Sequence, residues 1–355
     1  MADMTEPAIL FITRKWAPAT GGMETFCLRL TEALTRSQPV ETIALAGREN
    51  GMPPSALSLM LFPFTVIARI LKRQAPAQIV HLGDMAIWPL GLLFGRGSRL
   101  VISAHGTDVA YHRRAGVTGA LYGAYLRLGA KLLPRARVIA NSRATADVLG
   151  ETGWKAAATI ALATDFSAPE KASPRHDTIL FAGRLTKRKG CGWFIANVLP
   201  LLPKGMKLVI AGTRWDAEES QALDNPRVEF LGPQNAAELS RLYASSLCVI
   251  VPNIAIASRE YEGFGLVAPE AASCGGVVLA AKCDGLLDAV LDGETGFHLE
   301  SGNAQIWAEK IAEIAGWSPQ KRGDFTSAAQ AKAREFYNWD RVADQYLAAY
   351  SEDLT

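Results

Sequence analysis

Two glutamates lie eight positions apart in the second half of the sequence, on either side of a Gly-Phe-Gly turn. Glu262 precedes the turn, and Glu270 follows it in a segment with a helical pattern. If the turn opens that helix, backbone N–H groups of Phe264, Gly265 and Leu266 can bind a phosphate at the positive end of the helix dipole. Glu270 can then accept hydrogen bonds from paired sugar hydroxyls. The structural alternative is a capping acid followed by a solvated glutamate.

A basic loop forms the second candidate cluster. It runs from Gly183 to Gly190, directly after a predicted strand at 178–182, and it includes Arg184 and Lys189. In open α/β sheets, ligands bind beyond the carboxyl ends of the strands, so this loop is well placed to meet one. The planar fork of Arg184 and the point charge of Lys189 can both bind a diphosphate. The alternative is an ordinary basic surface loop.

The first half of the chain repeats a pattern of strand, loop and helix. An apolar run at 8–13 predicts a buried strand, a glycine-containing loop follows at 18–22, and a helical pattern covers 24–35. Helical patterns also separate the later strands, and this alternation is typical of a doubly wound parallel sheet. The later strands are predicted at 42–46, 79–82, 100–104 and 138–141.

The same alternation restarts after a polar segment at 163–177, which contains Pro169 and Pro174 and predicts a linker. A chain of 355 residues exceeds the roughly 250–300 residues at which one core stops growing, so we expect two domains. Apolar residues at four-residue spacing in 339–350 predict an amphipathic closing helix. The strands of the second domain are predicted at 178–182, 207–211, 228–231, 248–251 and 277–280.

The composition is that of an ordinary globular protein. Hydrophobic residues make up 49% and charged residues 20%, which excludes wholesale disorder. The five cysteines show no C-x-x-C spacing, so we expect buried thiols rather than disulfides or a zinc site. The first six residues lack a basic region, and apolar stretches at 56–68 and 85–94 contain prolines and are too short to span a bilayer. We therefore expect a cytoplasmic protein without a transmembrane segment.

Charge is distributed unevenly along the chain. Residues 1–165 contain 18 Lys and Arg against 11 Asp and Glu, and the remainder contains 19 against 24, so the net charges are +7 and −5. This asymmetry suggests an anionic partner for the first half, with a solvated basic helix face as the alternative. The basic cluster consists of Arg113, Arg114, Arg127, Lys131, Arg135 and Arg137.

Together these strings resemble the GT-B glycosyltransferases, in particular the retaining family 4, and the resemblance covers nearly the whole chain. Glu262 and Glu270 resemble the family's Glu-x7-Glu motif, and Arg184 and Lys189 resemble its basic pair. The other matching strings are Pro18 to Glu24 (an N-terminal glycine loop), His105-Gly106-Thr107-Asp108 (an H-G-x-D element), Asn141-Ser142 (an N-S turn), Ser273-Cys274-Gly275-Gly276 and Asp292-Gly293-Glu294-Thr295-Gly296.

The resemblance implies an α/β protein of the GT-B fold, in which two Rossmann-like, doubly wound domains face each other across a cleft and a C-terminal helix crosses back. It implies an acceptor-binding domain at 1–165, a nucleotide-sugar-binding domain at 166–335, and a helix at 336–355 that packs toward the first domain. The implied donor is a nucleotide-diphosphate sugar, with UDP or GDP as the nucleotide. No other cofactor is implied.

The resemblance also implies how the donor is held. Gly22 would offer its backbone N–H to the donor phosphate, while Arg184 and Lys189 would bind the diphosphate. Glu270 would bind the nucleotide ribose, in the segment that includes the turn at 264–266. Glu262 would contact the transferred sugar.

His105 is the remaining residue to which the resemblance assigns a catalytic role, beside Glu262, Arg184 and Lys189. It would lie near the sugar, unless it is a structural histidine at a strand end. Asp108 would either orient the acceptor or cap the next helix.

Sugar transfer requires positive charge at the leaving group. Breaking the bond between the anomeric carbon and the diphosphate builds negative charge there, and Arg184, Lys189 and a helix N-terminus would stabilise it. The sequence contains no Asp-x-Asp string, the usual carboxylate clamp for a divalent metal, so we expect metal-independent transfer. The resemblance implies retention of the anomeric configuration, through front-face attack assisted by the leaving phosphate and without a protein nucleophile.

Three segments depart from the family pattern. The loop at 254–261 is longer than the segment that usually precedes the acidic motif, and such a loop can shape donor selection. The segment 284–288 replaces a common Gly-x-Pro-Glu string, and 161–165 lacks the frequent Asn-Gly-Val-Asp. The identity of the donor sugar therefore does not transfer from relatives.

We expect the acceptor to be a glycan or a polyprenyl-diphosphate-linked glycan of bacterial-type polysaccharide synthesis, at the inner face of the plasma membrane. The basic first half and the apolar segments at 57–70 and 117–133 fit peripheral contact with an anionic membrane, but ordinary buried helices are the commoner interpretation of both segments.

A soluble small-molecule acceptor is the alternative, and a nucleotide-sugar epimerase of the same fold is a more remote one. The sequence shows no clean G-x-G-x-x-G followed by an acid, which argues against a dinucleotide-dependent oxidoreductase. A nucleic-acid partner is not expected.

Overall fold

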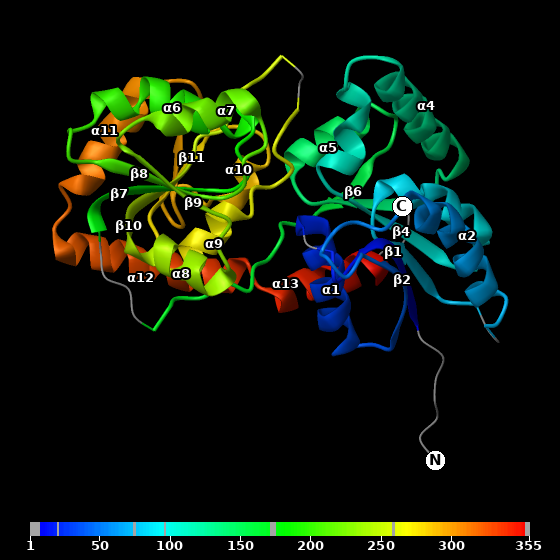
Figure 1. Ribbon diagram of the computed structural model, residues 1–355. Coiled ribbons are helices and arrows are strands. Elements are labelled where there is room, and N and C mark those ends of the chain that lie inside the picture. The colour runs from blue at the N-terminus through cyan, green and yellow to red at the C-terminus, as the bar shows by residue number, and fades with distance from the viewer. Residues whose placement is uncertain are drawn as a thin grey trace. The chain divides into compact units, whose positions relative to one another are not determined.

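The chain forms two compact units (Figure 1). The computed structural model describes residues 8–19, 21–73, 76–95, 97–170, 175–257 and 260–351. The first unit combines Met1–Leu162 with Trp339–Thr355, and the second is Ala163–Asn338. The divisions predicted from the sequence lie after residues 165 and 335.

The first unit is built around a six-stranded parallel sheet with the order β2-β1-β3-β4-β5-β6. Its central strands are nearly continuous apolar runs, because helices cover both faces of the sheet. The strands are β1 (Ile9–Trp16), β2 (Val40–Ala46), β3 (Ile79–Leu82), β4 (Arg99–Ala104), β5 (Arg137–Ala140) and β6 (Ala156–Thr159). The helices are α1 (Gly22–Thr35), α2 (Ala56–Ile70), the 3-10 helix η1 (Met85–Leu93), α3 (Thr107–Ala110), the 3-10 helix η2 (Tyr111–Arg113), α4 (Val117–Leu132), α5 (Arg143–Gly150) and α13 (Trp339–Ser351).

The second unit repeats this architecture with the sheet order β12-β11-β10-β7-β8-β9, again all parallel. The predicted class, doubly wound α/β, is therefore confirmed for both units. The strands are β7 (Arg175–Ala182), β8 (Lys207–Ala211), β9 (Val228–Gly232), β10 (Ser246–Val251), β11 (Val278–Ala281) and β12 (Phe297–Leu299). The α-helices are α6 (Cys191–Asn197), α7 (Ala217–Gln221), α8 (Ala236–Ser245), α9 (Val267–Ser273), α10 (Leu286–Ala289), α11 (Ala304–Ala315) and α12 (Pro319–Phe336), and the 3-10 helices are η3 (Lys187–Lys189), η4 (Leu199–Leu201) and η5 (Ala222–Asp224).

Each sheet has a point at which the order of its strands changes direction. In the first unit the chain runs from β1 to β2 on one side and then returns to β3 on the other. In the second unit it runs from β7 through β8 to β9 and then returns to β10 on the other side of β7. Loops that leave neighbouring strands in opposite directions open a crevice for a ligand at the carboxyl ends of those strands. The fold therefore predicts one site after β1 and β3 and another after β7 and β10.

The last described helix, α13, belongs to the first unit and packs against α1 (Figure 1). It confirms the predicted amphipathic closing helix. His81 on β3 is fully buried, and its Nδ1 lies 2.6 Å from the hydroxyl of Tyr350 on α13. Its Nε2 lies 2.8 Å from Oγ of Ser103, which in turn lies 3.0 Å from the hydroxyl of Tyr346. Burial lowers the pKa of His81 to about 3, so the ring is neutral and ties α13 to the sheet.

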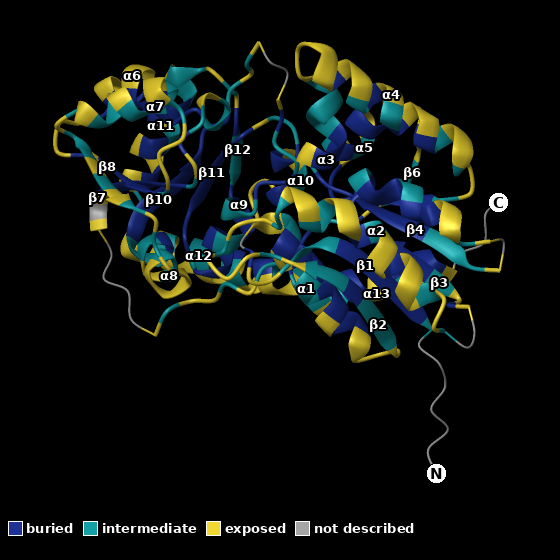
Figure 2. Ribbon diagram, turned by 45° about the vertical axis from the view of Figure 1, so that its right-hand side comes forward, coloured by how far each residue is buried: buried dark blue, intermediate teal, exposed yellow. Residues whose placement is uncertain are grey.

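The interpretation of 57–70 and 117–133 as ordinary buried helices is wrong. Among the described side chains of α2, only Phe62 and Val66 are buried, and in α4 the buried residues are Leu126 and three glycines. Exposed positions recur along both helices (Figure 2). The glycines of α4 allow a close approach to the unit, which leaves most of the large apolar side chains of this helix on the outside.

Two strands are missing from the sequence interpretation, and both lie at a sheet edge. The sequence of β6 is Ala-Ala-Ala-Thr, which has low strand propensity, and β12 has only three residues. Each strand pairs with a single neighbour, and the ladder rather than the local sequence holds it in an extended conformation.

The cysteines are free thiols, as the sequence predicts. Cys27, Cys191, Cys248 and Cys274 are buried, and Cys283 is partly exposed. Burial raises the pKa of Cys274 to about 11 and that of Cys283 to about 12, so both thiols are protonated at neutral pH.

Gly129 provides a test of how α4 packs. A Cβ atom there would lie 2.7 Å from ring atoms of both Trp88 and Trp154, whereas Gly150 at the end of α5 has open space around it. We expect Gly129→Ala to lower the free energy of unfolding by about 1–3 kcal/mol, because overpacking outweighs the gain in helix propensity. The matched control Gly150→Ala should be neutral or stabilising by at most about 1 kcal/mol. Urea denaturation followed by circular dichroism compares the two variants, and equal stability would contradict the packing.

Candidate functional site

Two loops of the second unit meet at the switch point between β7 and β10. Gly190, at the end of the basic loop, has a φ of +70°, and a Cβ atom there would lie 2.0 Å from the carbonyl oxygen of Pro252. The backbone N–H of Ile254 donates to the carbonyl of Arg188 at 3.0 Å. Only glycine fits this backbone conformation and this contact without strain. The close approach places Arg188 and Lys189 beside the loop that follows β10.

Glu262 is at the centre of this site. Its Oε2 accepts hydrogen bonds from Nη1 of Arg188 at 2.8 Å and from Nδ2 of Asn253 at 3.2 Å, and it forms an ion pair with Lys189. The side chain is 12% exposed. Burial alone would raise the pKa of Glu262, but the positive charges of Lys189 and Arg188 hold this pKa well below its ordinary value. The carboxylate is therefore ionised and fixed in place at neutral pH.

The turn after Glu262 leads into α9, so the prediction that it opens a helix is confirmed. Gly265 has a φ of +95°, and a Cβ atom there would lie 2.4 Å from a leucine side chain of α10. Phe264 is buried and anchors the turn in the core of the unit. Leu266 occupies the N-cap position of α9. The turn thus joins Glu262 to the first turn of the helix that carries Glu270.

Among the described residues, Glu270 accepts a side-chain hydrogen bond at one of its two carboxyl oxygens. The hydroxyl of Tyr243 on α8 donates to Oε2 at 3.0 Å. Burial raises the pKa of Glu270 to about 7, although the hydrogen bond from Tyr243 and the charge of Lys189 lower it. This carboxyl group is therefore poised to gain or lose a proton near neutral pH.

Arg184 does not join the cluster around Glu262. It is exposed, and the centre of its guanidinium lies 5.1 Å from the centroid of the Trp215 ring. Of the predicted pair, the structure brings Lys189 to Glu262 and places Arg184 in a stacking contact at the end of β7. The binding of a diphosphate by both residues remains a prediction.

Four residues of this site are not identified from the sequence: Arg188, Tyr243, Asn253 and Trp215. Arg188 lies in a run of three cations, and a 3-10 turn directs consecutive side chains to different sides, so the run alone does not tell which of them face the site. The sequence shows the run of cations, but it does not show the direction in which each side chain points. Tyr243, Asn253 and Trp215 carry no motif.

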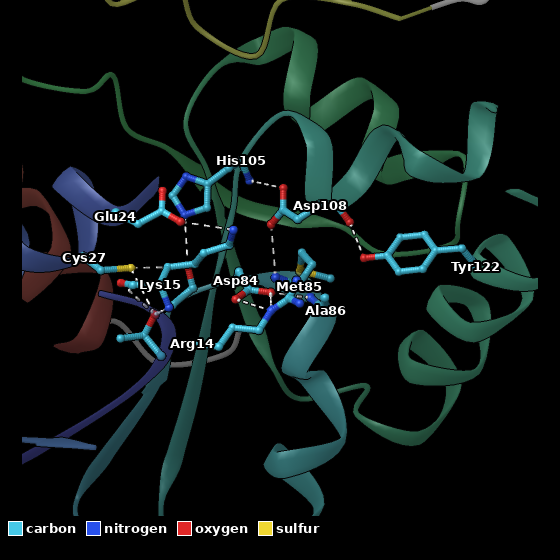
Figure 3. Close-up of polar contacts among 12 residues, drawn as sticks. Arg14, Lys15, Glu24, Cys27, Asp84, Met85, Ala86, His105, Asp108 and Tyr122 are labelled. Carbon is cyan, nitrogen blue, oxygen red and sulfur yellow. Dashed lines mark hydrogen bonds and ion pairs between the residues drawn. The ribbon is translucent and has the colours of Figure 1, made fainter. Parts of the chain in front are cut away.

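Polar side chains of the first unit gather at the carboxyl ends of β1, β3 and β4 (Figure 3). Asp84 is fully buried, and its two carboxylate oxygens lie 3.2 and 3.1 Å from Nε of Arg14. One of them also accepts the backbone N–H of Ala86 at 2.9 Å, at the start of η1. The ion pair between Asp84 and Arg14 holds the partly exposed guanidinium at the switch point between β1 and β3. Neither Arg14 nor Asp84 is predicted from the sequence.

His105 is buried at the end of β4, and its Nε2 lies 3.0 Å from the carbonyl oxygen of Gly83. Since a carbonyl only accepts, Nε2 must carry a proton. Both oxygens of Asp108 accept backbone N–H groups, from His105 at 2.9 Å and from Met85 at 3.1 Å. Asp108 therefore ties the loop of His105 to the start of η1, and burial raises its pKa. Catalysis by His105 remains a prediction.

Gly22 is exposed and is the first residue of α1. The carboxylate of Glu24 in the same turn pairs with Nζ of Lys15 at 3.2 Å. A Cβ atom on Gly21 would lie 2.5 Å from the other oxygen of Glu24, so this carboxylate lies against the positive start of the helix. A phosphate at Gly22 would approach the same helix end. The contact between Gly22 and a donor phosphate remains a prediction.

Both halves of the chain match known family models. The model described as Glycosyltransferase Family 4 matches residues 20–161, and the model described as Glycosyl transferases group 1 matches residues 176–316. The chain belongs to glycosyltransferase family 4. The resemblance found in the sequence is therefore confirmed, and the β7/β10 site lies inside the group 1 match.

Characterised relatives of this glycosyltransferase include D-inositol 3-phosphate glycosyltransferases. The protein from Actinosynnema mirum is 38% identical over 125 residues, which are 35% of this chain and 28% of the relative. That from Mycobacterium avium strain 104 is 33% identical over 184 residues, 49% of this chain and 41% of the relative. The chain therefore spans less than half the length of these relatives.

Solved structures share the fold of this glycosyltransferase over nearly its whole length. Anabaena Alr3699/HepE in complex with UDP and glucose has a TM-score of 0.70 at 22% identity and covers 98% of this chain and 100% of its own. Sucrose-phosphate synthase from Thermosynechococcus elongatus has a TM-score of 0.72 at 19% identity and covers 96% and 98%. These similarities confirm the GT-B fold.

The pKa of Glu270 provides a test of its predicted contact with the ribose. Because this pKa is about 7, the group loses its proton between about pH 6 and 8, and the carboxylate accepts hydrogen bonds more strongly than the acid. We expect the affinity for the nucleotide of the donor, with UDP as the probe, to rise up to about tenfold over this range, and to stay nearly constant in Glu270→Gln. Isothermal calorimetry at several pH values measures both, and parallel pH profiles would contradict the contact.

Proposed function

We propose that this glycosyltransferase moves a hexose from a nucleotide-diphosphate sugar to an acceptor hydroxyl and retains the configuration of the anomeric carbon. The observation that carries this proposal is the fixed Glu262 carboxylate, beside Lys189 and Arg188, at the switch point of the second unit. UDP and GDP are the proposed nucleotides. UDP is the first to test, because it is the nucleotide named for Anabaena Alr3699/HepE.

In the proposed reaction, Lys189 serves two partners. Its ammonium has three N–H donors, so it can stay paired with Glu262 while it binds the donor diphosphate. Arg184, which is exposed at the end of β7, would close on the same diphosphate. As the bond to the anomeric carbon breaks, negative charge grows on the leaving phosphate, and both cations stabilise it. Arg188 and Asn253 also hold Glu262 in position while Lys189 contacts the donor.

Glu262 would accept a hydrogen bond from a hydroxyl of the transferred sugar. The acceptor hydroxyl then attacks the anomeric carbon from the face that the diphosphate leaves, and its proton passes to a phosphate oxygen. In this scheme the protein supplies no nucleophile. Because the positive charge comes from side chains, we propose that transfer needs no divalent metal and continues in excess EDTA.

We propose that the first unit binds the acceptor at the carboxyl ends of β1 and β3, where Arg14 and Asp84 lie. The proposed acceptor is a glycan or a polyprenyl-diphosphate-linked glycan of cell-surface polysaccharide synthesis. A lipid-linked acceptor would place the reaction at the cytoplasmic face of a membrane. A change in donor turnover on addition of such a glycan tests this choice.

A soluble acceptor is the second candidate, and the names of the relatives favour it. D-inositol 3-phosphate glycosyltransferases are named for a small phosphorylated acceptor. A side-by-side assay with inositol phosphate and with a lipid-linked glycan separates the two candidates. Conversion of one nucleotide sugar into its epimer, without transfer, would instead support the more remote epimerase.

Lys189 and Lys187 form a matched pair for testing the donor site. Lys189 contacts Glu262, whereas Lys187 lies two residues away, is exposed and pairs with Glu218 at 3.3 Å. We expect Lys189→Ala to lower kcat/KM for the donor by about 100-fold or more, because it removes charge from the developing phosphate anion. Lys187→Ala should change it by less than about threefold. Steady-state release of the nucleotide in EDTA measures both, and equal effects would contradict the role of Lys189.

Glu262→Gln keeps the shape of the side chain but removes its charge. We expect kcat to fall by about 100-fold or more, since the amide holds both Lys189 and the sugar less well, while the donor still raises the melting temperature. Thermal shift with and without donor shows whether the variant folds and binds. Wild-type turnover in a folded variant would rule out the role proposed for Glu262.

A further inference from the structure

Large apolar side chains are exposed mainly on the first unit. Among the described residues, thirteen are exposed in this unit and four in the second. Twelve of the thirteen belong to three segments: α2 with the residue after it, the end of η1, and α4. Single exposed apolar residues are ordinary, but a continuous set marks an interaction surface.

Along α2 the exposed apolar residues form one stripe. They recur at intervals of three or four residues, so they lie on the same side of the helix. Phe62 and Val66 lie on the opposite side and are buried against the unit. Exposure reaches 65% at Leu57, 72% at Met60 and 67% at Phe64. The stripe consists of Leu57, Met60, Leu61, Phe64, Ile67 and Leu71.

The pattern of α4 is the reverse of an ordinary surface helix. Gly119, Gly123 and Gly129 face the unit, and a Cβ atom on Gly119 would lie 2.0 Å from a backbone carbonyl oxygen. The outward side carries the large apolar residues, although a surface helix normally turns these inward. The outward residues are Val117, Leu121, Leu128 and Leu132.

The three segments lie on one face of the sheet. The connections from β2 to β3, β3 to β4 and β4 to β5 all cross the sheet in the same direction, so the right-handed crossover rule puts α2, η1 and α4 on the same side. Leu92 and Leu93 at the end of η1 are also exposed. We call this face the apolar face.

The charges along these three segments are predominantly positive. Residues 52–146 contain twelve Lys and Arg but only two acids, Asp84 and Asp108. Both acids are buried and hydrogen-bonded inside the unit. Exposed cations flank the two stripes, with Arg69 and Lys72 at the end of α2, and Arg127 and Lys131 on α4.

We propose that the apolar face docks on an anionic lipid bilayer, with α2 and α4 in the plane of the interface. Apolar side chains of this kind enter the acyl boundary, while flanking Lys and Arg contact the anionic head groups. A second copy of the same face is a poor partner, because it would bring like charges together. No helix among the described residues is long and apolar enough to cross a membrane, so contact by these helices is peripheral. The inference deepens the proposed function and rests on it in one respect. The lipid-linked acceptor gives the membrane contact its biological purpose.

Leu61 and Leu201 form a matched pair for the test. Leu61 on α2 is 51% exposed, and Leu201 on η4 of the second unit is 52% exposed. The experiment is co-sedimentation of the full chain, without donor or acceptor, with vesicles of phosphatidylcholine alone or of phosphatidylcholine and phosphatidylglycerol. We expect binding to the anionic vesicles only, weakened by salt. Leu61→Glu should reduce the partition coefficient about tenfold or more, and Leu201→Glu should leave it unchanged.

The cations are tested in the same assay. Replacing Arg127 and Lys131 by glutamine should weaken binding to anionic vesicles by about fivefold for each charge, from about 1 kcal/mol per residue. Thermal unfolding confirms that each variant is folded. No binding by the wild type, equal loss in Leu61→Glu and Leu201→Glu, or a dimer in sedimentation velocity that Leu61→Glu dissociates would overturn the proposal. Vesicle binding by a chain that fails every transfer assay would overturn the proposed function and leave this inference standing.

Discussion

An ionised carboxylate inside a protein needs positive charge or several hydrogen-bond donors close by, because an unpaired buried charge costs several kcal/mol. Glu262 meets this requirement with cations that lie more than seventy residues earlier in the chain. The contact exists because Gly190 lets the loop after β7 touch the loop after β10. Three features therefore build the site: the parallel sheet, the left-handed glycine and the Gly-Phe-Gly turn. Together they place one carboxylate, two cations and Glu270 at the edge of the sheet where the strands end.

Both units place polar side chains at the switch point of a six-stranded parallel sheet, but the strand orders and the chemistry differ. In the first, the pair of Arg14 and Asp84 lies at the carboxyl ends of β1 and β3, as the group around Glu262 lies at those of β7 and β10. A buried acid orients a cation in one case, and cations orient a buried acid in the other.

Much of the fold could be predicted, because the strands of a parallel sheet are runs of apolar residues that are visible in the sequence. Ten of the strands are predicted in this way. The edge strands β6 and β12 were missed, since only their neighbours keep them extended. The site could be predicted as far as its motifs, Lys189, Glu262 and Glu270. The position of Arg188 depends on how a 3-10 turn directs side chains, and the stacking of Arg184 depends on Trp215, which follows a different strand. The outward leucines of α4 were misjudged, because apolar periodicity shows that a helix has two faces but not which one is buried.

The position of α13 has a consequence for how the protein is made. The sheet of the first unit is complete once β6 has been synthesised, yet His81 on β3 is covered by Tyr346 and Tyr350 from the last described helix. During translation, the whole second unit leaves the ribosome before α13 does, because domains emerge in sequence order. Until then, the apolar side of α1 and the imidazole of His81 lack their native cover. The first unit to be synthesised is thus the last to be finished.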